Sequence, residues 1–316
     1  MISFIVIGRN EEEHLHKCFR SIRRACEENL LQEYEIVYVD SNSLDRSVEI
    51  ALTNNVEKIC RLTIVWNAAI GRNIGAKQAA GDILCFLDGD MEIVPSFIPL
   101  ILDEEKSLKY DLVSGDLLHY YYDEQSSMVG TKREFSHLES MFQKPITGGA
   151  FWIKKEIYDS IGGMDNRMRV SEDPELGLRL AKRGILLWFL PNVFIIHHTD
   201  IPKSVRIGEL LKCSWLYGSV YIYKFNLMNP YTYKRMIRND VSLIVLATTL
   251  LGSFFISPFL LALYPLCVLV RSKGKPTKFV YLVVRDILSL ICFIPAYKKR
   301  IKTENIPFEI VRQGIK

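Results

Sequence analysis

The chain has 316 residues, 49% of them hydrophobic, and a formal net charge of +4 at pH 7. This length can bury a full core and predicts one large domain with a smaller region attached. The mild charge gives no reason to expect a nucleic-acid partner. The seven scattered cysteines form no CxxC pair, which favours reduced thiols over disulfides or a zinc finger.

The first two hundred residues alternate between short apolar runs and helical patterns. Strands are expected at 3–8, 34–40 and 82–88, and helices at 11–28, 47–54 and 71–81. These strands are apolar on both faces, as in a parallel sheet covered by helices on both sides. The sequence therefore predicts an α/β domain in which the carboxyl ends of the strands share one polar edge.

A polar stretch follows each of these strands, at 8–10, 40–42 and 88–90. Asp88 and Asp90 flank a single glycine, which is typical either of a turn or of a metal site. Carboxylates are ligands for Mg²⁺ or Mn²⁺, which take the rest of their shell from phosphate and water. Gly89 would let the backbone approach such a ligand closely.

The pattern is less regular further along the chain. A strand is expected at 111–124, a Gly-Gly loop with a strand and a helix at 146–165, a helix at 171–184 and two short strands at 186–198. Glu172 and Asp173 begin a helix, where acids either favour the helix dipole or serve as a general base. An acid near a bound cation is expected to stay ionised.

Two residue pairs of this part of the chain remain open in role. Gly148 and Gly149 form either a simple turn or a place where substrate approaches the backbone. His197 and His198 end the last apolar run. Either could complete the shell of a manganese-class ion, although a surface histidine is the commoner case.

The C-terminal part has the composition of a membrane-associated region. Residues 203–238 mix Lys and Arg with Trp and Tyr, as at a membrane interface or on a basic solvated helix. The thirty residues 241–270 carry no charge, exceed the roughly 20 that a span needs, and contain Ser257-Pro258, which would break them into a hairpin. The alternative is a hydrophobic helix pair that forms a dimer. Segment 279–297 contains Arg285 and Asp286 and is expected at the interface or buried against protein.

Five stretches in series resemble the family-2 glycosyltransferases with their nucleotide-sugar-binding GT-A fold, and cover roughly residues 1–198. They are "SFIVIGRNEEEHLHKCFRSI", "YEIVYVDSNSLDRSVEIA", "GRNIGAKQAAGDILCFLDGDMEIVPSFI", "TGGAFWIKKEIYDSIGGMD" and "SEDPELGLRLAKRG". The resemblance implies an inverting transfer of one sugar from a nucleotide-diphosphate sugar, with a UDP-sugar favoured. The acceptor would be a hydroxyl of a lipid-linked or cell-surface glycan.

The resemblance also implies a role for each matched position. Asp173 would be the general base, and Asp90 the direct ligand of Mn²⁺ or Mg²⁺, with Asp88 and His197 beside it. Gly148, Gly149 and Glu172 would shape the acceptor and sugar pocket. The residues that would bind the nucleotide-sugar are Asn10, Glu11, Asp40, Asn42, Arg72, Asn73, Asp88 and Gly89.

The chain departs from the family pattern at both of the first strand ends. Residues 8–10 read Gly-Arg-Asn where relatives often have Pro-Thr-Tyr-Asn, and 40–43 lack the common second acid. The Gln-x-x-Arg-Trp signature of processive synthases is missing, which favours one sugar per encounter.

The expected organisation is a GT-A catalytic domain at 1–202, interfacial helices at 203–240 and a hydrophobic membrane-associated region at 241–316. Basic clusters on both sides of the apolar run predict a catalytic domain on the cytoplasmic face. One alternative function is a metal-dependent nucleotidyltransferase, although the loop after the first strand is acidic rather than glycine-rich and basic. The other is a catalytically inactive membrane scaffold.

Overall fold

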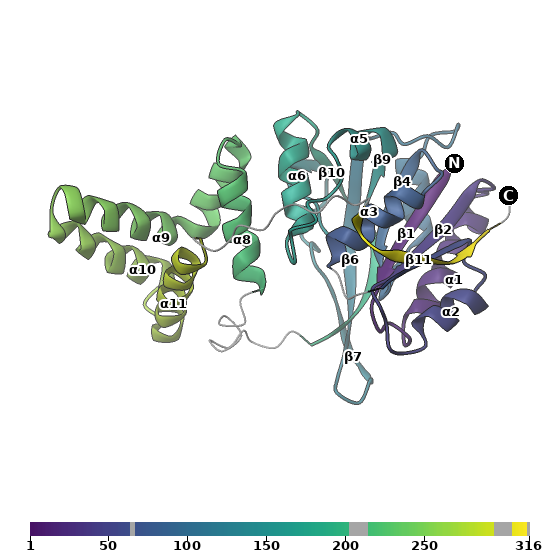
Figure 1. Cartoon of the computed structure of the whole chain (residues 1–316), viewed down its shortest axis with the longest axis horizontal. Coiled ribbons are helices and arrows are strands. Elements are labelled where there is room, and N and C mark those ends of the chain that lie inside the picture. The colour runs from purple at the N-terminus through teal and green to yellow at the C-terminus, as the bar shows by residue number, and fades with distance from the viewer. Residues whose placement is uncertain (64–66, 202–213, 294–304, 315–316) are drawn as a thin grey trace. The chain divides into compact units, whose positions relative to one another are not determined.

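An eleven-stranded mixed sheet forms the centre of the N-terminal part of the protein (Figure 1). The structure is a computed structural model that describes residues 1–63, 67–201, 214–293 and 305–314. It divides into two units, the first made of Met1–Arg167, Glu172–Pro202 and Arg300–Lys316 and the second of Met168–Ser171 and Lys203–Lys299.

The strand order is β11-β3-β2-β1-β4-β9-β6-β10-β5, with β7 paired to β6 and β8 to β10. The strands are β1 (Ile2–Gly8), β2 (Tyr34–Asp40), β3 (Lys58–Leu62), β4 (Ile83–Asp88), β5 (Met91–Ile93), β6 (Leu112–Tyr122), β7 (Met128–Arg133), β8 (Phe142–Lys144), β9 (Phe151–Lys154), β10 (Leu187–Asp200) and β11 (Phe308–Gln313). The mixed α/β fold and the three predicted strands are confirmed. The expectation of two short strands at 186–198 was wrong, because β10 continues along β6 through register shifts near Leu190 and Val193.

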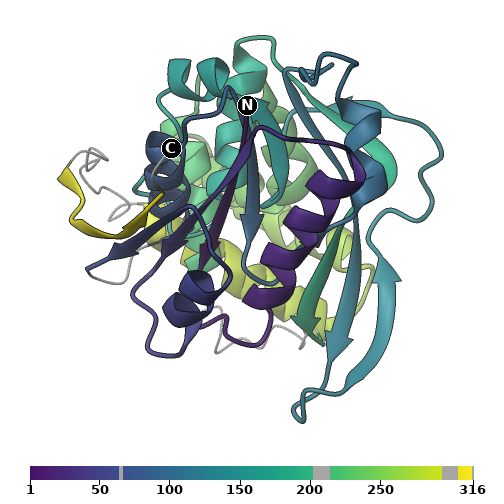
Figure 2. The same ribbon diagram turned by 90° about the vertical axis from the view of Figure 1, so that its right-hand side faces the viewer.

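The strand directions bring distant residues to one edge of the sheet. Strands β1 to β4 are parallel to one another, in the order β3-β2-β1-β4. Strand β9 is antiparallel to both β4 and β6, and β10 is parallel to β6. The carboxyl ends of β1, β2, β4, β6 and β10 therefore point toward the same edge. The β6–β7 hairpin extends beyond the other strands in both views (Figures 1 and 2).

Helices cover both faces of the sheet. The helices of this unit are α1 (Leu15–Glu28), α2 (Ser47–Thr53), α3 (Ala68–Gln78), α4 (Ile98–Ile101), α5 (Lys155–Ser160) and α6 (Glu172–Lys182), with the 3₁₀ turn η1 (Pro95–Phe97). Apolar residues three and four positions apart give α1 one buried face, which packs with α2 and α4 on one side of the sheet. Helices α3, α5 and α6 pack on the other side.

Helix α3 lies very close to β1 because two of its residues have no side chain. A Cβ atom on Gly75 would lie 2.3 Å from Cγ2 of Ile5, and one on Gly71 would lie 3.2 Å from Cγ2 of Ile7. Asn67 caps the helix by accepting a hydrogen bond from the Ile70 amide. This close packing buries Arg72 beside the polar edge of the sheet.

The last described strand, β11, belongs to the sheet and not to the helical unit. It pairs antiparallel with β3 and forms the outermost strand on that side (Figure 2). Residues 308–313 had been expected within the membrane-associated region 241–316. In the structure these residues instead pair with β3 as strand Phe308–Gln313, which places them in the first unit.

The second unit is helical. It contains α8 (Ser214–Phe225), α9 (Pro230–Phe255), α10 (Leu263–Ser272) and α11 (Pro276–Phe293), with the 3₁₀ turn η2 (Pro258–Ala262). The predicted break at Ser257-Pro258 is confirmed, since α9 ends at Phe255 and η2 begins at Pro258. The segments 203–213 and 298–302, on which part of the membrane prediction rests, lie outside the described residues.

Buried charge joins the helices of the second unit. Asp286 is fully buried, and Arg285 lies 2.6 Å from its Oδ1 and 3.2 Å from Oδ1 of Asp240. Tyr223 donates a hydrogen bond to Asp240, where α9 is kinked. The expectation that Arg285 and Asp286 are buried against protein is confirmed.

The apolar part of α9 faces outward within this unit. Among the described residues, α9 is the one helix with the length and hydropathy to cross a membrane, and 17% of its most apolar window is buried. Phe254, Phe255 and Phe259 are 83%, 77% and 86% exposed. The boundaries of a membrane-associated region remain a prediction.

Candidate active site

Asp88 and Asp90 follow β4 and have different partners. Oδ1 of Asp88 accepts a hydrogen bond from Nη2 of Arg72 at 2.6 Å. Oδ2 of Asp90 lies 3.2 Å from Nε2 of His197, whereas its Oδ1 is buried and has no hydrogen-bond partner among the described residues. An orphaned, buried carboxylate oxygen is costly unless something positive meets it.

Arg72 links this acid pair to the second acidic motif. Its side chain is 2% exposed, and Nη1 donates to Oε1 of Glu172 at 2.6 Å, while Nη2 also reaches the backbone carbonyl of Gly149 at 3.4 Å. Burial raises the pKa of Asp88, although the charge of Arg72 opposes this shift. One guanidinium therefore holds together the end of β4, the Gly-Gly loop and the start of α6.

Asp173 follows Glu172 in the first turn of α6. Burial, followed by the charge of Glu172, raises the pKa of Asp173 to about 7. In the protein alone burial outweighs the charge of nearby Arg72, and the ionised state expected beside a bound cation stays a prediction. A pKa close to neutral is what a general base needs.

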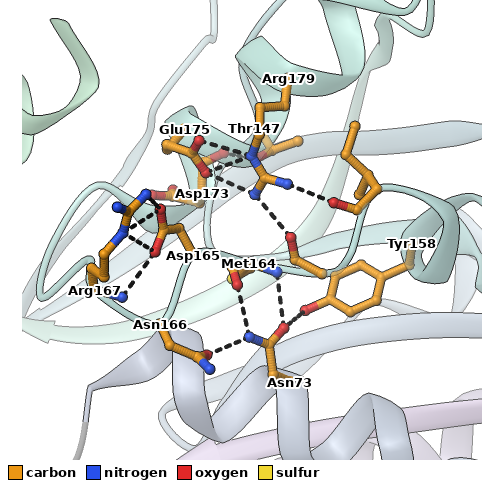
Figure 3. A network of polar contacts seen from close by, with 12 residues as sticks. Asn73, Thr147, Tyr158, Met164, Asp165, Asn166, Arg167, Asp173, Glu175 and Arg179 are labelled. Carbon is orange, nitrogen blue, oxygen red and sulfur yellow. Dashed lines mark hydrogen bonds and ion pairs between the residues drawn. The ribbon is translucent and has the colours of Figure 1, made fainter. Parts of the chain in front are cut away.

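A network of polar contacts holds the start of α6 in place (Figure 3). Thr147 donates its hydroxyl to the backbone carbonyl of Asp173. Arg179 forms an ion pair with Glu175 at 2.7 Å and donates to the carbonyls of Ile161 and Gly163. The helix that carries Asp173 is thus fixed to the loop after α5.

Asn73 belongs to the same network. Its Nδ2 donates to the carbonyl of Met164 at 2.8 Å and to Oδ1 of Asn166 at 2.6 Å, and its Oδ1 accepts from the hydroxyl of Tyr158 at 2.6 Å (Figure 3). The amide is buried and fully used by the protein. The structure therefore gives Asn73 an anchoring role, and a contact with the nucleotide-sugar remains a prediction without support from these bonds.

The glycines of the site differ in what surrounds them. A Cβ on Gly149 would lie 3.1 Å from Oδ2 of Asp88 and 3.3 Å from Nη2 of Arg72, whereas one on Gly148 would have nothing within 4 Å. A Cβ on Gly89 would lie 3.0 Å from Cγ of Glu11. In this structure Gly89 therefore makes room for Glu11, and the close approach of a ligand stays a prediction.

Glu11 lies among carboxylates at the end of β1. Burial, followed by the charges of Asp90, Asp88 and Asp45, raises the pKa of Glu11 to about 7. Its backbone amide donates to Oγ of Ser47 at 2.9 Å. These neighbouring acids disfavour one another's charged forms.

Asn10, Asp40 and Asn42 lie together at the ends of β1 and β2. Asp40 is fully buried and accepts hydrogen bonds from the Tyr38 hydroxyl at 3.0 Å and the Ser43 amide at 2.9 Å. Asn10 and Asn42 have positive φ angles of 58° and 59°, which Asn tolerates better than most residues. The bonds of Asp40 shape this loop, and its predicted contact with a base remains untested.

The strand alternation of β10 separates the two histidines of the doublet. His197 faces Asp90, while His198 is 4% exposed and bonds to Oε1 of Glu92 at 2.6 Å and to the Tyr122 hydroxyl at 2.7 Å. Burial disfavours the charged form of His197, but the hydrogen bond and charge of Asp90 raise its pKa above the usual value. Of the two, His197 is thus the candidate ligand.

Sequence reasoning missed His119, which lies next to His197. The Nδ1 atoms of the two rings are 3.1 Å apart. The predicted strand at 111–124 contains His119, but its sequence pattern does not show that this strand pairs with β10.

The residues at Asp90 fit a divalent cation. Mn²⁺ and Mg²⁺ accept donors of the types present here. These donors are the unpartnered Oδ1 of Asp90, the carboxylate of Asp88 and the imidazole of His197. Among the described residues no group of three His, Cys, Asp or Glu side chains is arranged around one point. This sparse set suits an ion that takes most of its ligands from a diphosphate and water.

Comparisons with known proteins show what this chain is similar to. The family model for "Glycosyl transferase family 2" matches residues 3–166. The O-antigen biosynthesis protein RfbC of Myxococcus xanthus is 26% identical over 198 residues, which cover 54% of this chain and 15% of that protein. The undecaprenyl-phosphate 4-deoxy-4-formamido-L-arabinose transferase of Salmonella choleraesuis is 25% identical over 209 residues, which cover 64% of this chain and 58% of that protein. The chain thus spans less than two-thirds of either relative.

Solved structures share the fold at low sequence identity. The structure of S. aureus TarS 1–349 in complex with UDP-GlcNAc has a TM-score of 0.54 and 16% identity, with 94% of this chain and 89% of that chain covered. The structure of GalNAc-T7 with UDP, GalNAc and Mn²⁺ has a TM-score of 0.52 and 18% identity, with 73% and 52% covered.

Proposed function

The chain belongs to glycosyl transferase family 2, since the family model matches more than half of its residues, and from this premise we propose its reaction. The proposed reaction is the inverting transfer of one sugar from a nucleotide-diphosphate sugar to a hydroxyl of an acceptor. A UDP-sugar is the favoured donor. The acceptor is a lipid-linked or cell-surface glycan.

One observation carries the proposal, namely the bridge that Arg72 forms between Asp88 and Glu172. It brings the Asp88–Gly89–Asp90 segment, where a donor diphosphate would bind, next to the helix that carries Asp173. Donor side and acceptor side must lie within one site for a direct displacement. The buried Arg72 is a single connection that serves both.

Asp173 is the proposed general base. With a pKa of about 7 it exists in both forms near neutral pH, so it can take the proton of an acceptor hydroxyl. The hydroxyl then attacks the anomeric carbon from the face opposite the diphosphate, which leaves as the bond to it breaks. Thr147 and Arg179 keep the base in position through the backbone of α6.

Asp90, Asp88 and His197 are the residues that would hold Mn²⁺ or Mg²⁺. Such a cation supplies charge that stabilises the departing diphosphate. The relatedness in fold to a structure that contains UDP and Mn²⁺ supports this part of the proposal. The protein's own contribution is the charge of Asp88 and Asp90, which acts on nearby Glu11 as well.

The second unit supports a lipid-linked acceptor and a place at the membrane. Its exposed apolar residues at 254–259 would be costly in water and favourable in a bilayer. One curated relative is named for transfer involving undecaprenyl phosphate, a lipid. We place the catalytic unit on the cytoplasmic face, from the basic clusters of the sequence.

The decisive experiment is a panel of nucleotide sugars, tested for thermal stabilisation of the full chain and for slow hydrolysis, with and without Mn²⁺. At least one UDP-sugar should stabilise the protein, and Mn²⁺ should increase the effect. If no nucleotide sugar binds under either condition, the donor assignment is wrong. The inactive-scaffold alternative predicts that Asp90→Ala leaves the cellular function intact.

A further inference from the structure

His119 and His197 form a pair of imidazoles beside Asp90. Strands β6 and β10 are parallel and place the two residues opposite each other in register, so both side chains lie on the same face of the sheet. Their Nδ1 atoms are 3.1 Å apart. Both side chains are largely buried, with 18% and 22% exposed.

The other nitrogen of each ring faces a carboxylate. Nε2 of His197 lies 3.2 Å from Oδ2 of Asp90, and Nε2 of His119 lies 3.8 Å from Oε2 of Glu134. The result is a chain in the order Asp90, His197, His119, Glu134. Its inner end is the proposed cation site and its outer end is a half-exposed glutamate.

The two rings allow two arrangements of the protons. Two Nδ1 atoms at this distance need one N–H between them, so one ring donates and the other accepts. If His119 donates, its Nε2 lone pair faces the carboxylate of Glu134 at 3.8 Å, and two acceptors oppose each other. If His197 donates, the proton of His119 lies on Nε2 and faces Glu134, while the Nε2 lone pair of His197 faces Oδ2 of Asp90 at 3.2 Å. A cation bound between these two acceptors removes their opposition, so a cation at Asp90 selects the second arrangement.

This second arrangement determines what His197 can bind. With the Nδ1 proton held by His119, the only lone pair that His197 can offer is on Nε2, the atom next to Asp90. A histidine that binds metal characteristically donates its other ring N–H to a fixed partner, which sets the tautomer and the ring orientation. His119 is in the place of that partner.

We infer that His119 is a positioning residue which, with Glu134 behind it, directs Nε2 of His197 toward a divalent cation at Asp90. This inference rests on the proposed function, because that function supplies the cation. His119 itself would not touch the cation or the donor. Loss of outer partners of this kind weakens metal affinity by about 10- to 100-fold.

The test measures Mn²⁺ affinity of the full chain in the presence of UDP, by the electron paramagnetic resonance signal of free Mn²⁺. His119→Ala should weaken Mn²⁺ binding by at least about tenfold. His119→Asn should restore much of it, because its side-chain oxygen can occupy the place of Nδ1 and accept the same proton. His119→Gln should restore less, since its amide corresponds in reach to Nε2. The exposed His137→Ala is the matched control and should bind Mn²⁺ like the wild type.

A second readout does not depend on Mn²⁺ affinity. The ¹⁵N chemical shifts of His197 in the wild type with Mg²⁺ and UDP should show a protonated Nδ1, and His119→Ala should lose this preference. If the wild type binds Mn²⁺ and His119→Ala binds it equally well, the inference is wrong and the proposed function stands. If the wild type binds no Mn²⁺, both the inference and the metal part of the proposed function are wrong. If the alanine variant does not fold, the comparison of Asn with Gln decides, and equal affinities would contradict the inference.

Discussion

Nη1 of Arg72 lies 2.6 Å from Oε1 of Glu172, although the two residues are 100 positions apart in the sequence. The same guanidinium holds Asp88, so a single buried cation balances acids from two separate motifs. Without this charge Glu172 would be largely desolvated and Asp88 would lose its ion-pair partner, so both acids depend on it.

Replacing Arg72 should therefore destabilise the first unit strongly. Arg72→Met removes one partner of a buried ion-pair network, which costs about 3–5 kcal/mol. Arg72→Lys should recover part of this, since an ammonium cannot reach both acids in the geometry of a guanidinium fork. Thermal unfolding followed by circular dichroism measures the effect. Arg46→Met, which breaks an exposed pair with Glu49, should leave the midpoint almost unchanged.

Asp173→Asn should separate binding from chemistry. The amide keeps the shape of the side chain but cannot accept a proton, so kcat should fall by about 10²- to 10⁴-fold. The donor should bind with nearly unchanged affinity, as measured by calorimetry with UDP or the preferred UDP-sugar. Turnover close to that of the wild type would assign the base to another residue.

The pH dependence of activity should report the same residue. Because the pKa of Asp173 is raised to about 7, kcat/KM should fall as the pH drops below 7 and the base becomes protonated. Burial is the main cause of the raised pKa and the charge of Glu172 is the next. Glu172→Gln should therefore move the fall of kcat/KM, the acidic limb of the pH profile, to lower pH. A limb that stays in place in Glu172→Gln would contradict the assignment.

The two glycines of the 148–149 loop should respond differently to one added methyl group. In Gly149→Ala the new Cβ lies 3.1 Å from Oδ2 of Asp88, so the acid and Arg72 must shift by a few tenths of an ångström. We expect a lower thermal midpoint and a higher KM for the donor. Gly148→Ala has no neighbour within 4 Å and should leave the thermal midpoint unchanged. Equal midpoints for the two variants would contradict this description of the loop.

The exposed aromatic residues of the second unit should determine vesicle binding. A triple substitution of Phe254, Phe255 and Phe259 by Ser should reduce cosedimentation with phosphatidylglycerol-containing vesicles, because these side chains are 83%, 77% and 86% exposed. Little effect on folding is expected from such exposed positions. Leu30→Ser, at an exposed leucine of the first unit, serves as the control. Vesicle binding that survives the triple substitution would contradict a membrane role for this surface.

The polar ends of the first strands could be predicted because buried parallel strands have a plain sequence pattern. Asp88 and Asp90 follow such a run directly. The bridge made by Arg72 could not be predicted, because it depends on how closely two glycines let α3 approach β1. The bonds of Asn73 were missed for a similar reason, since its partners Tyr158, Met164 and Asn166 are 85, 91 and 93 residues later.

The histidine doublet shows where local reasoning ends. Strand alternation alone places His197 and His198 on opposite faces of β10. Which face meets Asp90 depends on the neighbouring strands β5 and β6, and these are specified by pairing over long distances. Strand β11 was missed because six residues with two charges and a remote partner carry little local signal.

The pairing of β11 with β3 also has a consequence for the order in which the protein is made. Phe308 pairs with Leu62, and the hydroxyl of Thr63 bonds to the carbonyl of Pro307 across 244 positions of sequence. During synthesis from the N-terminus, β3 therefore remains an open sheet edge until residues 308–313 have left the ribosome. The described helices α8 to α11 of the second unit are made in that interval. Until then an unpaired strand edge is exposed to other chains, so the nascent protein is vulnerable to aggregation until β11 arrives.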